Sequence, residues 1–151
     1  MHTGNFVGSN LNNMENEFIP YEQALALKEL GFDEECFAYY NLKEEITFKS
    51  CHNRVPIIMS GKKCGMPLYQ QAFSFFREKY NLDGSMSVDV WNKKTTSYRI
   101  TGGIKGIVEA NSYGALYDID SKDYDTYEEA ELECLKKLIE IVKEKFAQLK
   151  N

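Results

Sequence analysis

The sequence predicts an α+β fold: an antiparallel sheet of three to five strands packed by two main helices and extended by an N-terminal helix and a β-hairpin. Three observations support this prediction. A capped amphipathic helix fills the last quarter of the 151-residue chain. A second amphipathic helix starts near Pro67. Between these helices lie three segments with the alternation and turn residues of an antiparallel meander.

The N-terminal segment differs in composition from the rest of the chain. Residues 1–17 are rich in Asn, Gly and Ser and show no periodic apolar pattern, which predicts a flexible leader. The length of the remaining segment, residues 18–151, fits one α+β domain with a single core.

A short helix and a hairpin are expected after the leader. Good helix formers fill residues 21–30, and Gly31 suits the left-handed position that ends a helix, with Phe32 as its apolar contact. Residues 36–40 and 46–49 are rich in aromatic or β-branched side chains and predict two short strands joined by a turn. Residues 50–66 have no regular pattern.

Both main helices have clear starting signals. Pro67 suits the first position of a helix that Asn81 stops. Thr126, followed three residues later by Glu129, forms a capping box that opens the final helix. The final helix has an apolar stripe at three- and four-residue steps, made of Ala130, Cys134, Leu135, Leu138, Ile141, Val142, Phe146 and Leu149.

Three strands are expected between the main helices. They cover residues 86–91, 96–101 and part of 107–119, with turns at 92–94 and 102–103. The first alternates apolar and polar side chains, which is typical of a sheet with one buried face and one face in water.

From Pro67 onward, the order helix, three strands, helix resembles the double-stranded RNA-binding domain. That family grips phosphates with a basic cluster that opens its final helix. The matching positions here read Tyr127, Glu128, Glu129, Ala130 and Glu131. Because carboxylates at this place repel RNA, the sequence argues against this activity.

A second resemblance lies in the amino-acid sequence of several short segments: residues 21–24, 30–32, 36–40, 69–73, 76–80 and 127–131. These segments are similar to small uncharacterised proteins encoded by phages and prophages of gut Bacteroidota, over about residues 20–145. The resemblance implies a mobile-element protein in a host cytosol, and it brings no known activity, cofactor or catalytic residue.

The charge and hydropathy of the chain argue against two classes of partner, nucleic acids and membranes. A net charge of -5 and a pI near 5.1 argue against tight nucleic-acid binding. No segment has the roughly 18 consecutive apolar residues of a membrane-spanning helix, and the N-terminus lacks the pattern of a signal peptide. We therefore expect a cytoplasmic protein without membrane contact, and the sequence leaves open whether it is a monomer or a dimer.

Cys36, Cys51, His52 and Cys64 are the candidates for a metal site or a thiol enzyme. Their spacing lacks the paired C-x-x-C units of a zinc site, so a loop with reduced thiols is the favoured interpretation. No catalytic signature accompanies them, and we predict no catalytic residue and no cofactor.

Basic residues suggest an anion-binding site. Lys62 and Lys63 lie between two glycines just before the second helix, where backbone amides could hold an anion. Arg77 and Arg99 are further candidates for ligand binding. A solvated turn is the favoured alternative for residues 61–65.

Aromatic residues on the predicted strands suggest an interaction surface, formed by Tyr39, Trp91, Tyr98, Tyr113 and Tyr117. An exposed aromatic face beside Arg99 would suit a partner protein, whereas cross-strand packing is the plainer alternative. We therefore predict a small soluble non-enzymatic protein of phage or mobile-element type that binds a protein partner. The alternatives are a nucleotide- or anion-sequestering protein and a zinc or thiol enzyme.

Overall fold

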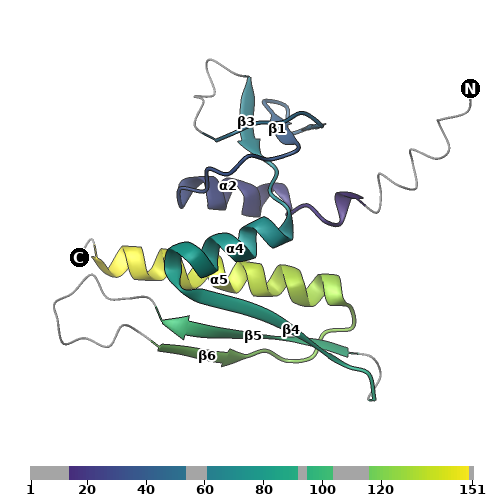
Figure 1. Cartoon of the computed structure of the whole chain (residues 1–151), viewed down its shortest axis with the longest axis vertical. Coiled ribbons are helices and arrows are strands. Elements are labelled where there is room, and N and C mark those ends of the chain that lie inside the picture. The colour runs from purple at the N-terminus through teal and green to yellow at the C-terminus, as the bar shows by residue number, and fades with distance from the viewer. Residues whose placement is uncertain (1–13, 54–60, 92–94, 104–115, 150–151) are drawn as a thin grey trace, which may run out of the picture. The chain divides into compact units, whose positions relative to one another are not determined.

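The computed structural model describes residues 14–53, 61–91, 95–103 and 116–149. These residues form three helices and two three-stranded antiparallel sheets, so the predicted α+β class is confirmed (Figure 1). The chain separates into two compact units, residues 1–71 and 72–151, which are described one at a time. The prediction of a single domain over residues 18–151 stays a prediction. Most of the expected leader, residues 1–13, lies outside the described residues.

The first unit contains helix α2 (Tyr21–Glu29) and a sheet with the strand order β2-β1-β3. Strands β1 (Tyr39–Asn41) and β2 (Ile46–Thr47) pair as the predicted hairpin. The third strand, β3 (Lys62–Gly65), pairs antiparallel with β1. The interpretation of these four residues as a solvated turn is therefore wrong, because their backbone takes part in a sheet. Anion binding by Lys62 and Lys63 stays a prediction.

Helix α2 ends as the sequence predicts. Gly31 has a positive φ of 92°, and its N–H donates to the carbonyl of Lys28. The N–H of Phe32 donates to the carbonyl of Leu27 at 2.9 Å, and the Phe32 side chain is buried. These two bonds form a Schellman motif, in which a glycine without Cβ adopts the left-handed conformation at low cost.

The outer edge of β3 is closed by two side chains. The Asn53 amide donates to the carbonyl of Phe32 at 2.9 Å and accepts the N–H of Gly65 at 2.8 Å. The Lys28 ammonium donates to the carbonyl of Lys63 at 2.6 Å. An open strand edge invites pairing with another chain, so these contacts protect the edge and connect β3 to the end of α2.

The second unit begins within helix α4 (Tyr69–Tyr80), whose first turn belongs to the first unit. It continues with β4 (Leu82–Asp89), β5 (Thr95–Gly103), β6 (Leu116–Asp120) and α5 (Tyr127–Leu149). The predicted order of helix, three strands and helix is confirmed, and the sheet has the meander order β4-β5-β6.

Several predicted boundaries in this region differ from the structure. Helix α4 starts two residues after Pro67, and β4 covers Leu82–Asp89 rather than residues 86–91. Residues 102 and 103 extend β5 and do not form a turn. The predicted turn at residues 92–94 lies outside the described residues.

The two faces of the β4-β5-β6 sheet have different chemistry. Helix α5 lies along one face and contacts β4 and β5 (Figure 1). The buried residues of this side come from both the sheet and the helices and include Phe76, Leu82, Ile100, Ala130, Cys134, Leu135, Leu138 and Val142. Alternation places polar side chains on the opposite face, and the strand register pairs Arg99 with Asp120 and Thr101 with Asp118. The predicted wet face is confirmed.

A tight backbone junction joins the end of α4 to the end of β5. Asn81 has a positive φ of 54° and ends the helix, as predicted. Its carbonyl accepts the N–H of Gly103, and its side-chain amide donates to the Gly103 carbonyl at 3.0 Å. Gly102 has a φ of 131°, and a Cβ at this position would overlap the Asn81 carbonyl oxygen. Only glycine fits here.

Helix α5 begins at the predicted cap, where the Glu129 N–H donates to the Thr126 hydroxyl oxygen at 3.1 Å. We expect Thr126→Ala to lower the free energy of unfolding by about 1 kcal/mol, because this N–H loses its partner. Thr126→Ser keeps the hydroxyl and serves as the control, with a much smaller loss. Urea denaturation followed by circular dichroism measures both variants. Equal losses would contradict the assigned cap.

Among the helices that the structure describes, none is long and apolar enough to cross a membrane.

Candidate functional site

The end of β4 carries the most exposed large apolar side chain in the described part of the chain. Trp91 is 91% exposed, and its neighbours Val90 and Val88 are 66% and 48% exposed. We call the exposed stretch that these three residues form along the chain the Trp91 surface. Trp is among the residues that contribute most to protein–protein binding energy, and an almost fully exposed indole gains little for the folded chain itself.

The backbone beneath the Trp91 surface is held in place. The Trp91 N–H donates to the Asp89 carboxylate at 3.0 Å, which fixes the chain just beyond the strand. Val88 pairs with Thr96 on β5, and Thr96 exchanges two backbone hydrogen bonds with Tyr124 at 2.9 and 2.8 Å. The Trp91 surface therefore adjoins the paired end of β4, and support by a paired strand lowers the entropy cost of binding.

Among the other aromatic residues singled out on the strands, Tyr98 does not join Trp91 in an exposed face. Tyr98 is buried on the side of α5 and stacks on Tyr124, with ring centroids 6.1 Å apart. Burial raises the pKa of Tyr98 to about 12. Tyr117 is half-buried, Tyr39 belongs to the first unit, and Tyr113 lies outside the described residues. The structure therefore shows that Tyr98 packs within the fold and does not form part of an exposed aromatic face.

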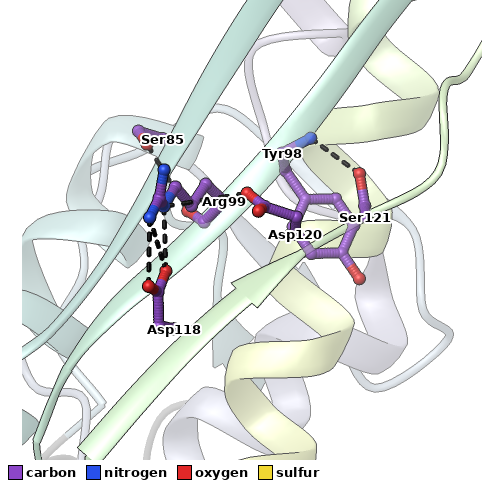
Figure 2. Close-up of polar contacts among 6 residues, drawn as sticks. All are labelled: Ser85, Tyr98, Arg99, Asp118, Asp120 and Ser121. Atoms are coloured by element: carbon purple, nitrogen blue, oxygen red, sulfur yellow. Dashed lines mark hydrogen bonds and ion pairs between the residues drawn. The ribbon is translucent and has the colours of Figure 1, made fainter.

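Arg99 lies on the polar face of the sheet, away from Tyr98 (Figure 2). Its guanidinium makes a bidentate pair with Asp118 at 2.9 and 3.0 Å and lies 3.7 Å from Asp120. The hydrogen bond and charge of Asp118 raise the pKa of Arg99. The carboxylates of Asp118 and Asp120 therefore neutralise the positive charge of Arg99, which an anionic ligand would need for binding.

Lys62 and Lys63 meet aromatic rings within the first unit. The Lys62 ammonium lies 4.9 Å from the centroid of the Tyr39 ring, and that of Lys63 lies 5.0 Å from the Tyr21 ring. Lys63 also forms an ion pair with Glu44 at 2.6 Å. The structure thus brings together Lys62, a predicted anion-binding residue, and Tyr39, a predicted residue of the interaction surface. The positive charge of Lys63 is already neutralised by the Glu44 carboxylate.

The Glu44–Lys63 pair predicts a measurable titration. A hydrogen bond from Lys63 and then its charge lower the pKa of the exposed Glu44 carboxyl. Since the folded-state value is the lower one, the stabilisation is present above the ordinary glutamate pKa and is lost as the pH falls through the folded-state value. We expect NMR to show a Glu44 midpoint below that of an ordinary glutamate.

Two lysine variants test this cause. Lys63→Met should raise the Glu44 midpoint toward the ordinary value, whereas Lys62→Met should leave it unchanged. A midpoint that responds equally to both variants would show that the pair does not set it.

Arg77, the remaining predicted ligand residue, belongs to the second unit and pairs with Asp83 at 2.9 Å. Ligand binding by Arg77 stays a prediction from the sequence.

Three of the four cysteines gather in the first unit. Cys36, Cys51 and Cys64 are buried and reduced, whereas His52 is exposed. Burial raises the pKa of Cys36 to about 12 and that of Cys64 to about 11, so both thiols are neutral and weakly nucleophilic at pH 7. In the described ranges, no group of three or more His, Cys, Asp or Glu side chains is arranged to hold a metal ion.

Comparison of this chain with protein-family models, curated proteins and solved structures found no match. The resemblances to phage-encoded proteins and to the double-stranded RNA-binding domain stay predictions from the sequence.

Proposed function

We propose that the protein is a small non-enzymatic binding protein that acts through a protein partner, with Trp91 as its principal contact residue. The observation that carries this proposal is the 91% exposure of the Trp91 side chain on a hydrogen-bonded hairpin. Large aromatic side chains at the centre of an interface commonly dominate its binding energy. The phage or mobile-element type is part of the proposal and rests on the sequence resemblance alone.

The alternative functions have weaker support. An anion or nucleotide site would use Lys62 and Lys63, but Glu44 already pairs with Lys63. A zinc or thiol enzyme would need reactive thiolates, whereas burial keeps Cys36 and Cys64 protonated.

A capture experiment with matched variants tests the proposal. Tagged wild-type protein, Trp91→Ala and Phe37→Ala are each used to recover proteins from a bacterial host lysate. Phe37 is the control because it is 66% exposed and belongs to the first unit. We expect one partner to bind the wild type and the Phe37 variant and to lose at least about tenfold in affinity with Trp91→Ala, which corresponds to roughly 1.4 kcal/mol.

Two outcomes of this experiment would contradict the proposal. A partner that binds Trp91→Ala as tightly as the wild type would exclude Trp91 as the principal contact. A bound nucleotide or metal in the purified wild-type protein, detected by native mass spectrometry, would instead favour one of the alternative functions.

A further inference from the structure

Two of the buried cysteines face each other across an antiparallel bridge in the first unit. The Cys36 N–H donates to the Cys51 carbonyl at 2.8 Å, and the Cys51 N–H donates to the Cys36 carbonyl at 3.0 Å. Next to them, the Ser50 hydroxyl donates to the Glu35 carboxylate. Residues paired in this way have Cα atoms about 5.5 Å apart, within the range of about 4.4–6.8 Å found for disulfides.

Both sulfur atoms lie against the same residue of β3. A Cβ on Gly65 would lie 2.9 Å from the Cys36 Sγ and 3.4 Å from the Cys51 Sγ, so the two thiols share the space that this glycine leaves open. Cys64 precedes Gly65 on the same strand, and adjacent strand residues point to opposite faces. Cys51 is therefore the better placed partner for Cys36.

We propose that Cys36 and Cys51 form a reversible disulfide when the protein is exposed to a peroxide. Hydrogen peroxide oxidises the small thiolate fraction of one of the two cysteines to a sulfenic acid and is itself reduced to one water. The other cysteine loses its proton and attacks the sulfenic sulfur as a thiolate, the S–S bond forms, and the hydroxide that leaves takes up that proton as a second water.

The position of the pair sets the character of this bond. Both thiols are almost fully buried, so the oxidation is slow compared with that of an exposed cysteine. Directly paired strand residues have Cβ atoms about 4.5–5.5 Å apart, whereas a disulfide needs about 3.5–4.5 Å. The bridge must contract to form the bond, and a strained disulfide is easily reduced. The closed loop contains the whole β1–β2 hairpin.

The test is peroxide treatment of the folded full-length protein, followed by mass spectrometry. Intact mass is expected to fall by about 2 Da for one disulfide and to return with dithiothreitol. Trypsin then separates the relevant cysteines into three peptides, covering residues 29–43, 50–54 and 64–77. We expect the first two peptides to be linked.

Variants provide the controls. Cys64→Ser should retain the linkage, and Cys51→Ser should abolish it. Wild-type peptide mapping alone decides the case if a variant fails to fold. A dominant link to the 64–77 peptide, or oxidation to sulfinic acid without any linked peptide, would overturn the proposal.

Discussion

Gly102→Ala should lower the free energy of unfolding by about 3 kcal/mol or more. The substitution forces a side chain into a backbone with a φ of 131° and places its Cβ 3.1 Å from the Asn81 carbonyl carbon, in overlap with the attached oxygen. Because the obstacle is backbone, relief requires β5 to move away from the end of α4. Urea denaturation followed by circular dichroism measures the loss.

Gly61→Ala is the matched control for this prediction. Gly61 also has a positive φ, of 66°, but nothing lies within 4 Å of an added Cβ. Its substitution should cost only the backbone strain of about 1–2 kcal/mol. If the two variants were equally stable, the close approach of Asn81 to Gly102 would not matter energetically.

Asn53→Ala should lower the free energy of unfolding by about 2–3 kcal/mol, because it removes two hydrogen bonds and leaves the Gly65 N–H and the Phe32 carbonyl without the Asn53 amide. Hydrogen exchange of the Gly65 amide gives a local readout, and its protection should fall strongly in the variant.

The Asn53→Asp variant distinguishes the effects of the two hydrogen bonds that Asn53 makes. The carboxylate still accepts the Gly65 N–H but can no longer donate to the Phe32 carbonyl. We expect Gly65 protection to survive in this variant while global stability falls. Unchanged Gly65 exchange in Asn53→Ala would show that the amide does not close the β3 edge.

Local sequence signals were sufficient to predict those features that depend on contacts between residues close together in the chain. The Thr126 cap and the Gly31 helix end each involve contacts within a few residues, and both are confirmed. The alternation of β4 also predicted one polar face of the sheet, which carries Arg99 and Asp118. The same alternation placed Val88 and Val90 on the buried face, whereas they are 48% and 66% exposed.

Features that depend on distant pairing were not predicted. Strand β3 is only four residues long and gains its partner β1 from about 20 residues earlier, so no periodic pattern marks it. Gly102 looked like a turn residue, because the approach of Asn81 that requires glycine is set by tertiary packing. The role of Asn53 likewise depends on two segments that the sequence does not show as neighbours.

The candidate site was predicted in part. Trp91 was singled out among five aromatic residues, but an aromatic residue on a strand can face either the core or water. The sequence did not separate exposed Trp91 from buried Tyr98. Alternation offered a signal, since Tyr98 and Arg99 are adjacent and must point to opposite faces.

The central claim is that a partner protein covers Trp91. Because Trp91 is the only tryptophan in the chain, labelling with 5-fluorotryptophan gives a single ¹⁹F resonance that reports on this side chain alone. In the free protein, exchange of H₂O for D₂O should shift this resonance as expected for a solvent-exposed indole. With the captured partner at saturation, we predict that the solvent-dependent shift is lost. A resonance that remains solvent-exposed in the saturated complex would contradict the claim.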